Sequence, residues 1–196
     1  ILVKDINQKE TTNLDLGNSL TLLNNALSSA GFSLEITKNY KLKKPLVVYN
    51  SFSKDLKNKI LNNRNSIKLN EGSELILIDY NDSGTQNNFF KNTIDTVFLN
   101  KKASLKNILI QNLISNGHFY KYIKGSLESD SNYENYILSS GLKLNKIEIE
   151  INLNKDNSSC SIYSALNLVE NQHQEIKTRI NHNAPSCKSY QKIKNV

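Results

Sequence analysis

The nearest histidine–cysteine pair in the sequence is His182 and Cys187, five positions apart across the turn-forming segment 183–186. Imidazole and thiolate are both good ligands for iron or zinc, but a complete site needs about three or four ligands. His118, His173 and Cys160 are the other imidazole and thiol candidates, and stacked strands can bring them together. We favour the simpler interpretation, in which His182 hydrogen-bonds within its turn and Cys187 packs as a small apolar residue. No residue is therefore assigned as a metal ligand.

Two other groups of residues have types suited to chemistry. Glu148 and Glu150 lie two positions apart on the polar face of a predicted strand, where a carboxylate pair can perform acid–base catalysis. We expect them to be solvated instead. Four tyrosines can form a platform for stacking sugars, or can cover neighbouring strands or a partner interface: Tyr120, Tyr122, Tyr133 and Tyr136. The sequence predicts no catalytic residue and no enzyme.

Charge and composition argue against several classes of protein. The 25 basic and 18 acidic residues give a net charge of +7, but the lysines are scattered and only Arg64 and Arg179 are arginines. Nucleic-acid-binding surfaces cluster basic residues with stacking aromatics, so we expect no nucleic-acid partner. Apolar runs such as 75–78 are far too short to cross a bilayer, and nothing resembles a signal peptide. Two cysteines are too few for a disulfide scaffold, which favours a cytoplasmic location, or an organelle if the source is eukaryotic.

Alternating apolar residues predict the fold class. In the last third of the chain, the runs 146–153, 160–169 and 174–180 alternate with period two, and turn-forming residues separate them. Earlier strand candidates are 32–37, 46–49, 66–69, 74–80, 93–99 and 104–110. Strands that recur about every 10 to 20 residues are typical of a solenoid. The pattern predicts a mainly β chain, with a parallel β-helix and an antiparallel sandwich as the alternatives.

One helix is expected, over residues 17–31. Leu16, Leu20, Leu23 and Leu27 fall on one helical face. Asn18 or Ser19 can cap its start, and Gly31 can take the left-handed conformation at its end. Residues 1–65 are therefore interpreted as an N-terminal α/β segment, and residues 66–196 as an incomplete β-helix core.

Several stretches, in this order, resemble the SufD branch of the SufB/SufD family of the SUF iron–sulfur cluster assembly machinery. They are residues 17–52, containing LLNNAL, GFSLEI and KKPLVVYNS; residues 70–79, NEGSELILID; residues 92–112, NTIDTVFLNKKASLKNILIQN; residues 118–120, HFY; and residues 180–196, INHNAPSCKSYQKIKNV. The last stretch is the most specific. In the family it is a His-x-x-Pro segment followed by a serine and a lysine that lead into the next strand.

The resemblance implies a right-handed parallel β-helix flanked by helical terminal regions. It also implies a non-catalytic scaffold subunit that pairs with SufB, or with itself as a homodimer, and binds the ATPase SufC through a C-terminal helical domain. That domain does not occur in this sequence, which also contains no methionine, and we expect the chain to be part of a longer protein. The phosphate-binding pattern Gly-x-x-x-x-Gly-Lys-Ser/Thr is absent, in keeping with ATP bound by the SufC partner. No cofactor is expected on this segment, because the whole complex handles the cluster. The alternative function is a carbohydrate-active or carbohydrate-binding β-helix protein.

Overall fold

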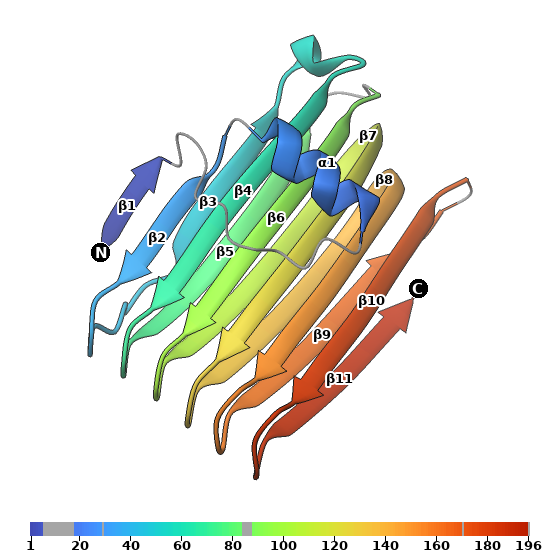
Figure 1. The fold of residues 1–196 in the computed structure, drawn as a ribbon. Helices are drawn as coiled ribbons and strands as arrows, with labels where there is room; N and C mark the ends of the chain where they lie inside the picture. The colour runs from blue at the N-terminus through green and yellow to red at the C-terminus, as the bar shows by residue number, and fades with distance from the viewer. Residues whose placement is uncertain (6–17, 29, 84–87, 170, 196) are drawn as a thin grey trace.

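A parallel β-helix of about five turns dominates the structure, a computed structural model that describes residues 1–5, 18–28, 30–83, 88–169 and 171–195 (Figure 1). Among these described residues, every strand pair is parallel except that between β1 (Leu2–Asp5) and β2 (Phe32–Ile36). The prediction of a parallel β-helix is confirmed. The antiparallel sandwich is wrong, because strands that follow one another in the chain do not pair as hairpins.

Two sheets form the walls of the solenoid. Sheet 1 contains β2, β4 (Ile60–Leu69), β6 (Phe90–Leu99), the second halves of β7 and β8, and β10 (His173–His182). Sheet 2 contains β3 (Leu46–Phe52), β5 (Glu74–Ser83), the first halves of β7 and β8, β9 (Ser159–Asn167) and β11 (Lys188–Asn195).

The two longest strands, β7 (Ser104–Leu127) and β8 (Asn132–Leu153), each run through both sheets. Residues 104–113 of β7 pair with β5 in sheet 2, and residues 118–127 pair with β6 in sheet 1. The register between β7 and β8 shifts between Asn112 and His118, where the chain passes from one sheet to the other. Equivalent residues of successive coils therefore form continuous rows across each sheet.

The core fills the space between the two sheets. In β8 the alternating side chains of Ile147, Ile149, Ile151 and Leu153 are all buried, as the sequence predicts. Cys160, at the start of the alternating run 160–169, belongs to the same apolar cluster. Burial of each such aliphatic side chain stabilises the fold by about 1.5–3 kcal/mol, and the rows repeat this contribution in successive coils.

One corner of the solenoid uses a left-handed backbone conformation in successive coils. The residues with positive φ at this corner are Asn39, Gly72, Lys102, Asp130, Asn157 and Ser186. The amides of the first five bond to the next coil, as in Asn39 N to Glu71 O at 2.8 Å and Lys102 N to Ser129 O at 2.9 Å. Main-chain bonds, rather than one invariant residue type, therefore hold the corner.

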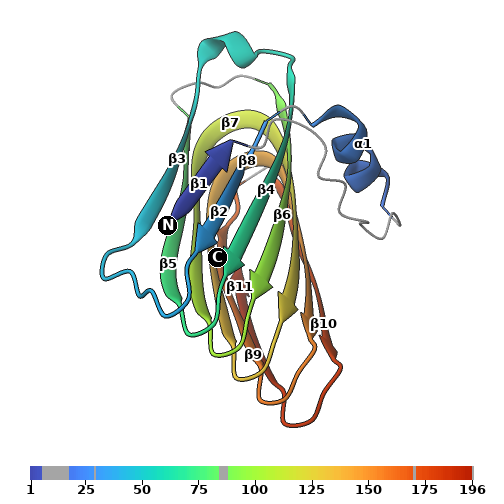
Figure 2. The ribbon, with the colours of Figure 1, turned by 60° about the vertical axis from the view of Figure 1, so that its left-hand side comes forward.

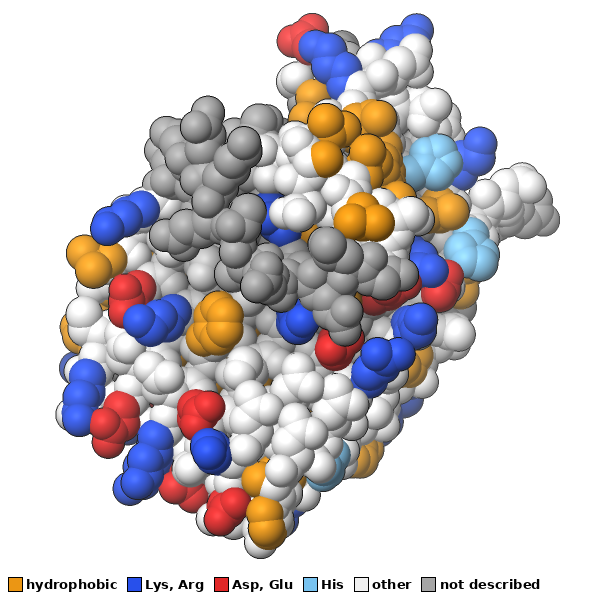
Figure 3. Space-filling model, in the orientation of Figure 1, with side chains coloured by type: hydrophobic (Ala, Val, Ile, Leu, Met, Phe, Trp, Pro, Cys, Tyr) orange, Lys and Arg blue, Asp and Glu red, His pale blue; other side chains and the backbone are white. Residues whose placement is uncertain are grey.

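Helix α1 (Ser19–Leu27) lies on the outer face of sheet 1 (Figures 1 and 2). Asn18 caps it, as predicted, by accepting a hydrogen bond from Leu20 N at 2.9 Å. The helix buries Thr21 and Asn24 against the sheet, whereas Leu27 is 56% exposed. The face that packs on the sheet is therefore centred on Thr21 and Asn24, and the predicted leucines lie beside it, with Leu20 and Leu23 half-buried. Figure 3 views this side of the molecule and shows hydrophobic side chains at the surface around α1.

Gly31 does not end the helix, which stops at Leu27 with Ser28 as its C-cap. It permits a close approach to β4 instead. Its φ is +153°, and a Cβ at this position would lie 1.6 Å from the carbonyl oxygen of Arg64. No residue other than glycine fits where the chain enters the first coil.

Segments with weak sequence patterns contain more strand than expected. Residues 51–65, which include none of the strand candidates named from the sequence, contain the end of β3, the short helix η1 (Lys54–Leu56) and the start of β4. The expected division at residue 65 falls within β4, and residues 6–17 lie outside the described part of the chain, including Leu16 of the predicted helix. Within the described residues, no helix has the length and apolar character needed to span a bilayer.

Candidate functional site

Four charged side chains lie inside the solenoid, between the two sheets. The ammonium group of Lys121 is 2.7 Å from Asp79 Oδ2 and 2.6 Å from Asp95 Oδ2. The fourth member, Lys91, donates to Asn81 Oδ1 at 3.0 Å and does not contact either carboxylate directly within 4 Å. These residues come from β5, β6 and β7, and each occupies an inward-facing position of its strand. We call them the interior charged cluster.

Neutral amide side chains donate further hydrogen bonds to the two carboxylates. Asn65 donates to Asp95 Oδ1 at 2.8 Å, and Asn50 donates to Asp79 Oδ1 at 2.8 Å. Asn81 donates to the same oxygen of Asp79 at 2.9 Å. A buried carboxylate is tolerated only with such hydrogen bonds and an opposite charge. The cluster is therefore a satisfied network rather than a pair of isolated charges.

The pKa values in the cluster reflect this arrangement. Burial alone would raise the pKa of Asp79, but the nearby Lys121 and Lys91 hold it below its usual value. Burial would lower the pKa of Lys121, but Asp79 and Asp95 raise it overall. Lys91 has no direct carboxylate partner, so burial dominates and lowers its pKa to about 8.

A cavity of about 270 Å³ adjoins the cluster at the N-terminal end of the solenoid. Asp79, Lys91 and Asp95 line it, together with Gly31 near the first coil. The hydroxyl of Thr93, which also lines the cavity, is buried and has no hydrogen-bond partner among the described residues. The cavity therefore presents both donors and acceptors, and suits a small polar molecule or ordered water.

Lys91 is the most chemically distinctive group of the cluster. Its ammonium lies 4.9 Å from the ring centroid of Phe52 and 5.5 Å from that of Phe119. Cation–π contacts stabilise the charged form, while burial favours the neutral amine. With a pKa of about 8, this amine exchanges a proton near physiological pH.

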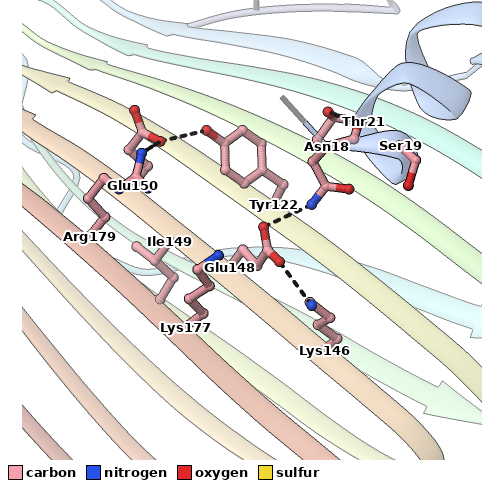
Figure 4. Close-up of a pocket in the computed structure, with 10 residues that line it drawn as sticks. All are labelled: Asn18, Ser19, Thr21, Tyr122, Lys146, Glu148, Ile149, Glu150, Lys177 and Arg179. Atoms are coloured by element: carbon pink, nitrogen blue, oxygen red, sulfur yellow. Dashed lines mark hydrogen bonds and ion pairs between the residues drawn. The ribbon is translucent and has the colours of Figure 1, made fainter. Parts of the chain in front are cut away.

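A second pocket, of about 440 Å³, lies on the surface between the start of α1 and the outer face of sheet 1 (Figure 4). Glu148 accepts from Asn18 Nδ2 at 3.0 Å and pairs with Lys146 at 3.1 Å. Glu150 accepts from the hydroxyl of Tyr122 at 3.2 Å. Glu148 thus attaches the start of the helix, and both carboxylates are already engaged in structural contacts.

The same contacts shift pKa values in this pocket. Burial and the neighbouring Glu150 raise the pKa of Tyr122 above its usual value. The hydrogen bond to Glu148 raises the pKa of Lys146. Lys177 is the lining cation that has no ion pair within the described part of the chain. The pocket therefore offers little free charge for a ligand.

The histidine and cysteine candidates do not converge. His182 Nε2 contacts Ser189 Oγ at 3.0 Å, and Cys187 Sγ lies 3.3 Å from Ser158 Oγ. His118 on β7 and His173 on β10 lie on opposite sides of Leu144 in β8, so strand β8 separates them. Within the residues that the structure describes, no three His, Cys, Asp or Glu side chains are grouped to hold a metal ion.

The four tyrosines do not form one platform. Tyr133 is inside the solenoid, and Tyr120 is buried on the outer face of sheet 1 beside Asn18. Tyr122 is also on sheet 1, whereas Tyr136 stacks on Tyr163 across sheet 2. The predicted platform of these four tyrosines, on which the carbohydrate alternative was based, is therefore wrong. Glu148 and Glu150 are half-buried and bonded, rather than freely solvated as expected.

Sequence reasoning missed the interior charged cluster, although a signal for it exists. In β5, Asp79 follows Leu75 and Leu77 in the same inward-facing phase, where an apolar residue is expected. Lys121 likewise stands between the buried Phe119 and Ile123. A charge in the apolar phase of an alternating strand therefore indicates a buried polar network.

A comparison with known protein families assigns the chain to one of them. Residues 51–196 match the family model described as SUF system FeS cluster assembly, SufBD core domain. No curated protein matches the chain significantly. The matched region covers β4 to β11 and the end of β3, which together contain most of the two sheets. The family match and the parallel β-helix agree, and we conclude that this chain belongs to the SufBD core domain family of SUF iron–sulfur cluster assembly.

Proposed function

We propose that this protein is a non-catalytic scaffold subunit of the SUF complex, the SufD-type partner of a SufB-type protein. In this role it acts with the ATPase SufC, which binds the ATP. The iron–sulfur cluster is the cargo of the whole complex and not a resident cofactor of this chain. The observation that supports the proposal most directly is the family match over residues 51–196 of a parallel β-helix.

Both cysteines are free thiols, Cys160 in the core and Cys187 half-buried at a corner. Free thiols are typical of proteins in reducing compartments. The proposal therefore includes a cytoplasmic setting, or an organellar one in a eukaryotic source.

The test is reconstitution of the full-length protein with the SufB-type and SufC-type proteins of the same organism. We expect a stable complex by size-exclusion chromatography, and more cluster formed from iron and sulfide with this subunit than without it. ATP hydrolysis should require SufC and be absent from this subunit alone. Failure to form a complex, together with unchanged cluster yield, would contradict the proposal.

A further inference from the structure

The outer face of sheet 2 carries two adjacent rows of apolar side chains that cross five strands. In the first row the register aligns Val47, Ile78, Ile108, Tyr136 and Tyr163. The second row consists of Tyr49, Tyr80, Ile110, Leu138 and Ala165. We call these two rows the apolar band.

The band is partly exposed despite its apolar character, and most of its members are half-buried. Val47 is 53% exposed, Tyr49 60% and Leu138 48%. Its aromatic rings stack along the rows, with centroids 5.3 Å apart for Tyr49 and Tyr80 and 4.8 Å apart for Tyr136 and Tyr163. The stacking makes a flat and rigid surface. Contiguous apolar surface of this kind marks interaction sites on soluble domains.

The outer faces of the two sheets differ in whether a helix covers them. Sheet 1 has α1 on its outer face, whereas no described element lies over the outer face of sheet 2 (Figure 2). Five strands about 4.8 Å apart span about 20 Å, which is the length of a helix of roughly 13–16 residues. Two rows are about as wide as one helix. The dimensions of the band therefore fit one α-helix lying across the strands.

One end of the band is bordered by basic residues. The rows continue onto β11, where Tyr163 aligns with Lys192 and Ala165 aligns with Lys194. Both lysines are exposed, and neither has an ion pair within the described residues. A polar border flanks the first row, where Lys106 and Glu134 form an ion pair at 3.4 Å. An apolar centre with a polar border is the usual anatomy of a protein interface.

We propose that the apolar band binds an amphipathic α-helix of a partner protein, oriented with carboxylates at the end that faces Lys192 and Lys194. The apolar face of that helix covers the two rows, and its acidic end pairs with the two lysines. This proposal does not depend on the cluster-assembly role.

The test uses a helical peptide of 15 residues, with leucines at i, i+3, i+4 and i+7 and three glutamates in its last turn. We expect saturable binding to the full chain in the micromolar range by fluorescence anisotropy. Leu138→Lys should weaken binding at least tenfold, because a charge then replaces a central apolar contact. Tyr49→Lys, at a more exposed position of the band, serves as a second variant if Leu138→Lys folds poorly. Phe98→Lys, on the outer face of sheet 1, is the matched control and should leave binding unchanged.

A charge exchange tests the orientation. A peptide with three lysines in place of the glutamates should bind the wild-type protein more weakly, and should bind the Lys192→Glu/Lys194→Glu variant better than the glutamate peptide does. Absence of saturable binding, or an equal loss in Phe98→Lys, would overturn the proposal. So would a concentration-dependent dimer, detected by sedimentation, that Leu138→Lys abolishes, because the band would then bind a second copy of this chain.

Discussion

Asn24 of α1 and Asn92 of β6 attach the helix to the sheet through reciprocal amide contacts. Asn24 Nδ2 donates to the carbonyl oxygen of Asn92 at 2.9 Å, and Asn92 Nδ2 donates to the carbonyl oxygen of Leu20 at 2.8 Å. Both side chains are completely buried. A polar contact, rather than the leucine face, therefore fixes the position of the helix.

Removal of this contact should release α1. Asn24→Ala leaves the buried carbonyl groups of Asn63 and Asn92 without their side-chain donor, at a cost of about 1–3 kcal/mol. We expect a lower free energy of unfolding in urea and faster hydrogen exchange in α1. Ser19→Ala, at an exposed position of the same helix, is the control, and equal exchange in both variants would contradict this account.

Gly31 should tolerate no side chain. Gly31→Ala places a Cβ against the main-chain oxygen of Arg64, which cannot move without displacing β4. We expect a loss of at least about 2 kcal/mol in the free energy of unfolding. In Gly125→Ala the new Cβ meets the end of the flexible Ile151 side chain at 2.5 Å, and the cost should be smaller. Urea denaturation of both variants measures the difference, and equal losses would show that the backbone contact is not decisive.

The buried ion pairs of Lys121 should contribute more to the free energy of unfolding than the partly exposed pair of Lys106. Lys121→Met leaves Asp79 and Asp95 without their shared cation, and we expect it to destabilise the fold by about 3–5 kcal/mol. Lys106→Met breaks the partly exposed pair with Glu134 and should cost at most about 1 kcal/mol. Combining Lys121→Met with Asp79→Asn and Asp95→Asn should restore much of the stability. A similar cost for the two single lysine variants in urea denaturation would contradict the proposed charge balance.

Lys91 should make stability depend on pH. Its pKa falls from 10.5 to about 8 on folding, so the unfolded chain binds more protons between these values. The contribution of Lys91 to the free energy of unfolding therefore rises as pH increases from about 8 to 10.5, by about 1–3 kcal/mol at most. The difference between the wild type and Lys91→Met, measured by urea denaturation across this range, isolates the effect. Lys143→Met, at an exposed lysine outside the cluster, is the control, and a wild-type minus Lys91→Met difference that stays flat or falls would contradict the assignment.

The sequence predicts the solenoid best where alternation is strict. Ile147 to Leu153 alternates without interruption, and the structure places these residues in the core. The weak pattern of residues 51–65 has a physical explanation, because the inward-facing residues of β4 include Asn63 and Asn65 beside the cavity. Polar residues inside the solenoid hide the alternation of that strand.

The candidate site is less predictable than the fold. Asp79 and Lys121 are 42 positions apart, and their contact depends on the register of three strands. That register is set by the lengths of the intervening turns and by the shift between Asn112 and His118, which no local pattern indicates. The sequence also does not predict which face of α1 packs on the sheet, because the buried contacts of Asn24 and Asn92 decide it. A single sequence therefore identifies the strands but not the partners of their inward-facing charges.

The corner turns have an evolutionary consequence. Residues as different as Asn39, Lys102 and Asp130 adopt the same left-handed conformation, because bonds between main-chain atoms define the corner. A complete coil is thus a unit that gene duplication can insert, or deletion can remove, without altering the geometry of its neighbours. Related proteins can therefore differ in their number of coils while the cross-section of the solenoid stays constant.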